Sequence, residues 1–492
     1  MKILIMILTL LTLAVFTACG GEDEYEAYDA VEYEADVNAD NGVTEPDIDG
    51  EPDPEGNEAT AVIPAVAEMP NWLAINILDD FDYANERERM WATDIAQFRR
   101  YVFSIHPKFR NPAIRYQPRN IAMGHAFDEH LATLIGNLPY MHDDFEIVVA
   151  IQRATAVFQD NHFAFEGFMS MVRAYRFPLE FGWLSDGFYL LRSHTDFTAF
   201  LNSRLVAING VSTEILLDET ARLIGVENVY DARHVFTRFA QSPVFLRELT
   251  AASSNEIILT FDNGGVPMEL ALNNSDAVSI ASYDEWRALL HSLVYSLQGD
   301  MPLFLQNRAE WFWYNFIEEY GILYLRFTAF DPFDSTMLAA VSEVFATYNV
   351  RAAIMDARGN DGGNHNNAPF HLLENHVPPD MLFYFIDKSV SAALLAGTRM
   401  ESMGATIVGQ PSGQSLNFYV FEVAHFSPLR YSRYEFIIPT RFVDARVTHG
   451  LTRDFPDDIF RPHVLIEHTI DDWINSHDPL LEYVKSLVNA NN

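Results

Sequence analysis

The C-terminal third of the chain alternates short apolar runs with longer amphipathic stretches. Apolar runs of strand length lie at Gly321–Phe327, Ala352–Met355, Met381–Ile386 and Thr406–Val408. Between them, apolar residues at helical spacing predict helices at Ser335–Thr347 and Ser391–Met403. Such alternation is typical of an α/β layer with parallel strands. Because ligands of these folds bind at the carboxyl ends of the strands, we expect a functional site in the loops there.

A mainly helical pattern precedes this region, and we assign residues 70–178 to an N-terminal helical domain. Apolar residues three and four apart predict helices at Glu86–Phe103, Phe127–Leu138 and Phe145–Phe158. Pro107, Pro112 and Pro118 interrupt the pattern between the first two. Short strand-like runs, including Phe181–Leu191, are expected to follow His162.

Residues 179–275 combine a strand, a turn, a helix and a hairpin. The run Arg204–Val211 predicts a strand that enters an Asn209-Gly210 turn, and Glu214–Ile224 has helical spacing. Glu256–Phe261 and Val266–Leu272 flank Asn263-Gly264-Gly265 and predict a hairpin. This order resembles a PDZ-type module, although Asn-Gly turns are common. The remaining residues, 276–490, form the expected α/β domain.

The N-terminus has the pattern of an export signal. Met1-Lys2 is followed by an apolar run from Ile3 to Phe16 and then by Thr17-Ala18-Cys19-Gly20. About 14 apolar residues are too few to span a bilayer, which needs roughly 20. The exit resembles the lipobox of bacterial lipoproteins, with Phe16 where Leu is usual, so residues 1–19 are expected to be a signal peptide with Cys19 as the lipidated residue. The alternative is an ordinary cleaved signal with an incidental cysteine.

Charge and cysteine content narrow the function classes. The 492 residues include 32 Lys+Arg and 69 Asp+Glu, a formal net charge of -37, and 16 of the acidic residues lie between Gly20 and Thr60. Residues 20–68 are therefore expected to be a disordered acidic linker that holds the folded body off the membrane. The acidic balance argues against a nucleic-acid partner. One cysteine cannot form an internal disulfide or a C-x-x-C metal site.

Two segments at predicted strand ends carry residues suited to catalysis. Asp356 to Asn364 is a glycine-dense loop whose backbone N–H groups could hold an oxyanion, or it is only a tight turn. It lacks the Lys-Ser/Thr pair of a phosphate-binding loop. Ser391 opens a predicted helix, where it suits a nucleophile or a helix N-cap.

A third candidate segment, Asp160-Asn161-His162, ends a predicted helix. A histidine is the commonest general base near neutral pH, and a neighbouring carboxylate could orient it. Most single histidines have no such role.

Taken in order, these segments resemble the S41 peptidase family, the clan of C-terminal processing and tricorn-core proteases. The likeness covers roughly residues 70–490. The matching segments are Asp160-Asn161-His162, the Ile208-Asn209-Gly210 region, Asp356 to Gly363, Ser391-Ala392, Val408 to Gly413 and Asp478 to Glu482. The resemblance implies a ClpP/crotonase-like ββα core with an N-terminal helical domain and a PDZ-like insert.

The resemblance also implies roles for individual residues. Ser391 would be the nucleophile and His162 the base, with oxyanion donors among the N–H groups of Ala392, Gly362 and Gly363. The processing branch uses a Ser/Lys dyad, but Gln414, Ser415 and Leu416 occupy the neighbourhood of its lysine. The chain is therefore closer to the tricorn-like, His-using branch, whose late carboxylate would be Asp457 or Asp458. Lys388 is too close to Ser391 in sequence to be placed as a base.

The expected function is a serine-type peptidase that acts on extracytoplasmic proteins or peptides from a lipid anchor on the outer face of the cell membrane. The alternative is a catalytically inactive S41-like protein that binds peptides or an apolar ligand. An α/β-hydrolase esterase is disfavoured because the chain lacks Gly-x-Ser-x-Gly. No cofactor or metal is expected: His125 and His130, five residues apart on a predicted helix, lie on different faces.

Overall fold

The computed structural model describes residues 83–490, together with 72, 77 and 78, except residues 113, 253, 309, 365–366 and 421–427. Contacts divide the chain into Met1–Glu68 and Met69–Asn492, and the description below concerns the second unit. The expected signal peptide, Cys19 and the acidic linker lie outside the described residues.

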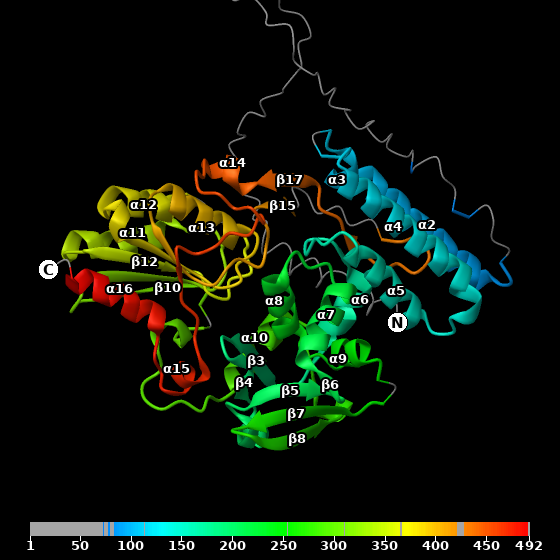
Figure 1. Cartoon of the computed structure of the whole chain (residues 1–492), viewed down its shortest axis with the longest axis horizontal. Helices are drawn as coiled ribbons and strands as arrows, with labels where there is room; N and C mark the ends of the chain where they lie inside the picture. Colours follow the sequence, from blue (N-terminus) through cyan, green and yellow to red (C-terminus); the bar gives the residue numbers. More distant parts are fainter. Residues whose placement is uncertain are drawn as a thin grey trace, which may run out of the picture. The chain divides into compact units, whose positions relative to one another are not determined.

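The C-terminal region is built on a six-stranded sheet in the order β10-β11-β12-β13-β14-β18 (Figure 1). Its strands are β10 (Phe312–Ile317), β11 (Ile322–Phe327), β12 (Ala352–Asp356), β13 (Leu382–Ile386), β14 (Thr406–Gly409) and β18 (Val464–Leu465). All neighbours are parallel except β10 and β11, which are antiparallel. The four apolar runs of the sequence are therefore the four central strands, as predicted.

Helices cover both faces of this sheet. The helices are α11 (Ser335–Thr347), α12 (Ala368–His376) and α13 (Ala392–Ser402) on one face and α16 (Pro479–Ala490) on the other (Figure 1). Residues alternate along β12: Ala353 and Met355 join the core under α11 to α13, whereas Ala352 and Ile354 join the core under α16. A strand buried on both faces reads as a continuous apolar run, which explains the sequence pattern.

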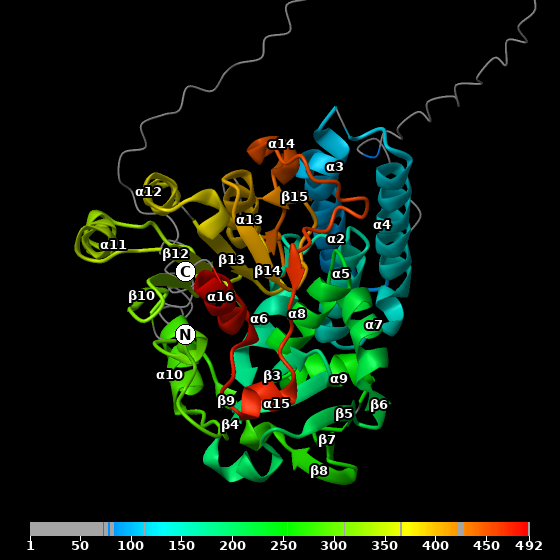
Figure 2. The ribbon, with the colours of Figure 1, turned by 60° about the vertical axis from the view of Figure 1, so that its left-hand side comes forward.

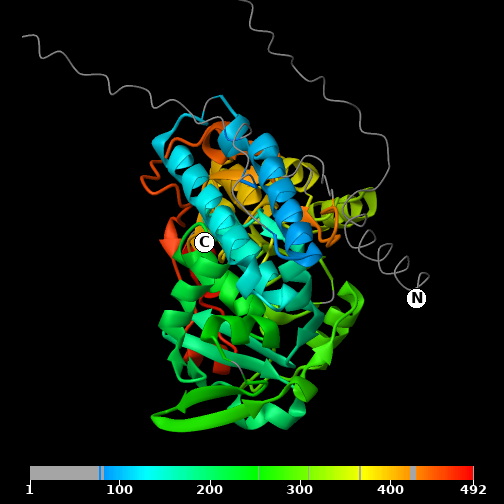
Figure 3. The ribbon, with the colours of Figure 1, turned by 90° about the vertical axis from the view of Figure 1, so that its right-hand side faces the viewer.

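The N-terminal region is helical. Its helices are α2 (Glu86–Ile105), α3 (Pro107–Arg110), α4 (Pro118–Asn137), α5 (Asp144–Ala156) and α6 (Glu166–Ala174). The long helices α2 and α4 lie side by side (Figure 3). Pro118 does not interrupt a helix but begins one, because the first turn of a helix needs no N–H from that residue. Short strands follow His162 as expected, with α6 among them, and α6 adds Phe168, Met169 and Val172 to the hydrophobic core.

The segment between these regions contains an antiparallel sheet in the order β3-β4-β5-β7-β8. Its strands are β3 (Leu179–Leu184), β4 (Gly187–Ser193), β5 (Arg204–Ile208), β7 (Ile257–Asn263) and β8 (Val266–Leu272). The short strand β6 (Val211–Ser212) pairs with β5 across the predicted Asn209-Gly210 turn. Along the chain, three helices separate β6 from β7: α7 (Thr213–Leu223), α8 (Val229–Phe239) and α9 (Pro243–Thr250) (Figure 2). The predicted hairpin is confirmed, and its PDZ-like identity stays a prediction.

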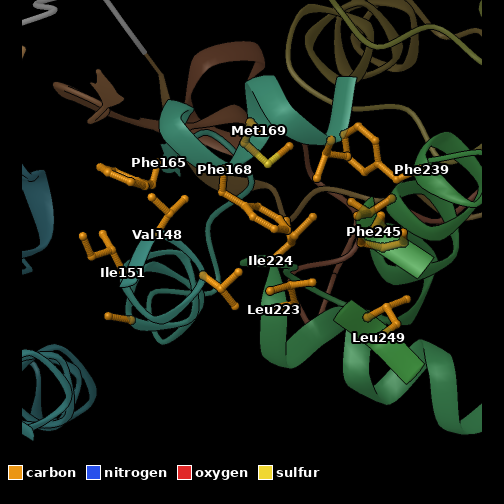
Figure 4. Close-up of a cluster of buried hydrophobic side chains, with 14 of the residues drawn as sticks. Val148, Ile151, Phe165, Phe168, Met169, Leu223, Ile224, Phe239, Phe245 and Leu249 are labelled. Atoms are coloured by element: carbon orange, nitrogen blue, oxygen red, sulfur yellow. The ribbon is translucent and has the colours of Figure 1, made fainter. Parts of the chain in front are cut away.

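The helical region and this insert share one hydrophobic core. Phe168 of α6 lies beside Ile224 at the end of α7, whereas Phe165 of β1 (Ala164–Phe165) lies beside Val148 of α5 (Figure 4). Both phenylalanines belong to one cluster that also contains Phe245 of α9. The same core contains residues of the late segment Leu429 to Ile438, where β16 (Phe436–Ile437) pairs with β1. The insert is therefore built into the body.

Candidate active site

The candidate site lies where the central strands of the large sheet end. The loops after β11, β12, β13 and β14 carry Phe330, Gly362, Ser391 and Gln414 respectively. The first two loops touch through a bridge between Phe330 and Gly363. These loops are at the carboxyl ends of parallel strands, which is where the sequence predicted a site.

Ser391 occupies a strained position at the start of α13. It is the N-cap residue and its backbone has φ 53° and ψ -126°, a conformation that non-glycine residues rarely adopt. Such strain costs about 1–3 kcal/mol and persists only where surrounding contacts impose it. The helix-opening serine of the sequence is therefore held in an unusual geometry, half-buried at a helix N-terminus that favours developing negative charge.

The glycine-dense loop packs directly on Ser391. A Cβ added to Gly362 would lie 2.6 Å from Cβ of Ser391, and one added to Gly363 would lie 2.0 Å from the carbonyl oxygen of Phe330. Both glycines have positive φ, of 100° and 125°. The loop therefore requires glycine for close approach as well as for backbone conformation.

Not every predicted oxyanion donor is available. The N–H of Gly362 donates to Oδ1 of Asn360 at 2.7 Å, and the N–H of Ser391 donates to Oε1 of Gln414 at 2.5 Å. The N–H groups of Gly363 and Ala392, on the same two segments, stay candidates for the oxyanion hole.

Gln414 joins the predicted nucleophile to the predicted base. Its Nε2 lies 3.0 Å from Nδ1 of His162 while its Oε1 accepts from the Ser391 N–H. Two hydrogen bonds and one amide group thus separate the Ser391 nitrogen from Nδ1 of His162, so these atoms are at most about 8 Å apart. Residues more than 200 positions apart in sequence are brought into one network, as the ordered motifs implied.

Asp160 holds the His162 segment by its backbone. Its Oδ1 accepts from the N–H of His162 at 3.0 Å, and its Oδ2 lies 3.4 Å from Nε2 of His106. Asp160 and His106 are fully buried. Burial lowers the pKa of His162, so its imidazole stays neutral at a lower pH than a free histidine.

The insert supplies an unexpected part of the site. Glu227 precedes α8, and its two carboxyl oxygens accept from Nε2 of Gln414 at 3.0 Å and from the N–H of Ser415 at 2.9 Å. Burial, together with the carboxyls of Asp160 and Asp231, raises the pKa of Glu227 well above its ordinary value. The surroundings of Glu227 therefore favour its protonated form more than water does.

Asn228 and Asp231 tie α8 to two further segments. Nδ2 of Asn228 donates to the carbonyls of Ser412 and Gly413, and Oδ1 of Asp231 accepts from Asn161 at 3.2 Å. Burial raises the pKa of Asp231 to about 6. Farther along α8, Nε2 of His234 lies 2.8 Å from the carboxylate of Asp361, next to Gly362.

The remaining predicted residues lie in ion pairs. Asp458 pairs with Arg446 at 2.6 Å, and Asp457 pairs with Arg461, which lowers the pKa of Asp457. Nζ of Lys388 lies 3.3 Å from Asp387. No local sequence pattern predicts the contacts of Glu227 and Gln414, because they depend on how the insert folds against the loop that carries Gln414.

The start of the glycine-dense loop is anchored by buried charge. Arg358 pairs with Asp356 at 2.5 Å and with Asp478 at 2.9 Å, which joins the loop to the Asp478-Pro479 segment. The arginines at 358 and 326 lower the pKa of Asp356 to about 2. Two of the sequence motifs are thus in contact, with a structural role.

The residues that the structure describes lack two features. They contain no group of three or more His, Cys, Asp or Glu side chains arranged to hold a metal ion. Within the same residues, no helix combines the length and apolar character needed to cross a membrane.

Comparison with solved structures defines the fold class. The structure of mature CPAF complexed with lactacystin is similar over 82% of this chain and 98% of that chain, with a TM-score of 0.52 and 11% sequence identity. The chain therefore shares the fold of mature CPAF, and the predicted α/β class is confirmed.

Weaker similarities extend to two named proteases. The photosystem II D1 C-terminal processing protease is 12% identical over 78% of this chain and 94% of that chain, with a TM-score of 0.34. The tricorn protease is 12% identical over 82% of this chain and 37% of that chain, with a TM-score of 0.38. No protein-family model matches the chain, and no curated protein matches its sequence.

Proposed function

We propose that this protein is a serine-type peptidase in which Ser391 is the nucleophile and His162 the general base. The observation that carries the proposal is the network in which Gln414 joins a strained, helix-opening serine to a half-buried histidine whose pKa is lowered. A glycine loop with candidate oxyanion donors packs on the same serine. The fold shared with mature CPAF is consistent with this chemistry.

The reaction follows from these positions. Oγ of Ser391 attacks the carbonyl carbon of the peptide bond while its proton passes to His162. The N–H groups of Gly363 and Ala392, with the N-terminus of α13, stabilise the oxyanion. The C–N bond then breaks, and the amine leaves with the proton from His162. Water repeats the sequence on the acyl-serine, releasing the carboxylate product and regenerating Ser391.

We also propose that the substrates are extracytoplasmic proteins or peptides and that the protein is held at the outer face of the membrane through Cys19. The lipobox-like sequence and the acidic stretch that follows it support this proposal. Cys19→Ala should move the full chain from the membrane fraction of the source cells to the soluble fraction. Equal membrane retention of this variant would contradict a lipid anchor at Cys19.

Peptide cleavage tests the activity. The full chain should cleave members of an unstructured peptide library, Ser391→Ala should abolish cleavage, and His162→Ala should reduce it by about 100-fold or more. Ser402→Ala, an exposed serine in the last turn of α13, is the matched control and should cleave normally. A folded wild-type chain that cleaves nothing would instead favour the non-catalytic binding protein.

A further inference from the structure

The carboxamide of Gln414 has its two ends in different chemical surroundings. Its Oε1 faces the Ser391 N–H, which can only donate a hydrogen bond. Its Nε2 faces Nδ1 of His162 at 3.0 Å, Oδ1 of Asn161 at 3.2 Å and Oε1 of Glu227 at 3.0 Å. Because the Ser391 N–H fixes which end is the oxygen, the amide cannot be turned over without placing two donors against each other.

This orientation determines where the imidazole proton lies. The amide nitrogen of Gln414 has two hydrogens and no lone pair to accept a proton, so a proton on Nδ1 of His162 would face a donor at 3.0 Å. The neutral His162 ring therefore carries its proton on Nε2. The imidazolium form is disfavoured as well, because it would place a second donor against Nε2 of Gln414. The lowered pKa of His162 likewise disfavours the imidazolium form.

We propose that Gln414 is a positioning residue that fixes the backbone of the nucleophile and holds His162 as the neutral tautomer with its proton on Nε2. The catalytic consequence rests on the proposed function: the lone pair that receives the serine proton is the one on Nδ1, and receiving it breaks the hydrogen bond from Gln414. Gln414 is fully buried, so water does not replace this contact in the resting site.

Charged groups around His162 come from four segments. Asp160 lies in the same loop as His162, and His106 and Lys108 lie at the start of α3. Glu227 precedes α8, and Asp231 lies in the first turn of α8. Burial lowers the pKa of Lys108 to about 8 and that of His106 to about 4. Since these groups stay in place when position 414 changes, a matched pair of variants isolates the contribution of Gln414.

Gln414→Glu separates the two contacts. A glutamate keeps an acceptor for the Ser391 N–H but offers His162 an acceptor in place of a donor. The raised pKa of Glu227 favours the protonated carboxyl that can donate to the new side chain. The tautomer should therefore change to Nδ1–H, and the pKa of His162 should rise by about 1 unit or more, as expected for a carboxylate in contact. Gln298→Glu, an exposed change elsewhere on the surface, is the control for added charge.

Nitrogen-15 NMR of the full chain labelled at histidine measures the tautomer directly, with His162→Gln identifying the signal. We expect a protonated Nε2 and an unprotonated Nδ1 in the wild type, and the reverse in Gln414→Glu. A wild-type His162 that carries its proton on Nδ1 would overturn the proposal without any variant, and so would a Gln414→Glu spectrum that matches Gln298→Glu. If the wild-type chain shows the expected tautomer but cleaves no peptide, the proposed function is contradicted and this inference stays intact.

Discussion

At the scale of single residues, the site depends on a close approach of backbone to Ser391 that leaves no room for an added side-chain carbon. Gly362 packs closely against Ser391, and the amide oxygen of Gln414 accepts a hydrogen bond from the Ser391 N–H. Between them, these contacts impose the left-handed backbone of Ser391. The geometry of Ser391, the proposed nucleophile, is therefore set by residues outside its own helix.

Gly362→Ala tests this close approach. The added methyl would meet Cβ of Ser391 at 2.6 Å, so Ser391 should be displaced and peptide cleavage should fall by about 100-fold or more. Gly359→Ala is matched within the same loop: its φ is 67°, but nothing lies within 4 Å of the added methyl. It should cost about 1–2 kcal/mol of stability and leave cleavage nearly unchanged. Equal losses in both variants would show that Gly362 matters only for loop conformation.

The residue scale also shows what the sequence could and could not predict. The sequence predicts a role for Ser391, His162 and the Asp356 loop because each has a local pattern: a helix-opening serine, an Asp-x-His segment and clustered glycines. Gln414 was noticed only as a departure from the processing branch. Its function depends on residues 161, 227 and 391, which no local pattern connects. Glu227 had no signal at all.

At the scale of elements, α8 links the insert to the loops of the candidate site. Asn228 caps this helix through the N–H groups of Tyr230 and Asp231 and also donates to two carbonyls of the loop that carries Gln414. The sequence predicts most of the core strands, the hairpin and α11, the last with the bounds that the structure has. It did not predict α8, although Ala232, Val235, Phe236 and Phe239 repeat at helical spacing on the buried side of that helix.

Asn228→Ala should separate helix capping from site assembly. Loss of the cap should lower the free energy of unfolding by about 1 kcal/mol, and the lost carbonyl contacts should reduce peptide cleavage by about 10-fold. Asp334→Ala removes the N-cap of α11, which is exposed and caps through Met337. This control should lose similar stability with normal cleavage in the same assay. An equal loss of cleavage in both variants would argue against a role for α8.

The first turn of α8 also predicts a pH dependence of stability. The pKa of Asp231 is raised from 3.8 to about 6, so its neutral form is favoured by folding, and its stabilising contribution is lost as pH rises from about 4 to above 6. The shift corresponds to about 3 kcal/mol. His106, with a pKa lowered to about 4, has the opposite slope over part of this range.

A difference measurement removes the contribution of His106. The free energy of unfolding of Asp231→Asn, measured with urea, should increase relative to wild type as pH rises from 4 to 7. A difference that is independent of pH would mean that Asp231 titrates normally in the folded protein.

At the scale of the whole molecule, the helical region and the insert behave as one folded unit. Their shared core joins Phe165 and Phe168 to Leu223 and Phe245 (Figure 4). The sequence predicts two separate domains here, because the pattern changes from helix to strand near residue 178. Packing between the two patterns is a tertiary property that the patterns themselves do not contain.

Removal of the insert should therefore unfold the helical region. A chain without residues 179–275 would expose several aromatic side chains at about 25 cal/mol per Å² of apolar surface. We expect it to lose the cooperative thermal transition of the full chain and to be cleaved rapidly by added trypsin within the helical region. A shortened chain that melts cooperatively and resists trypsin would contradict the shared core.

The central claim is that Ser391 is an activated nucleophile supported by His162. Treatment of the full chain with a fluorophosphonate probe, followed by peptide mapping of the adduct, tests it most directly. We predict a single adduct on Ser391, absent in Ser391→Ala, about 100-fold slower in His162→Ala and unchanged in Ser402→Ala. A folded wild-type chain that forms no adduct, or forms it on another serine, would contradict the claim.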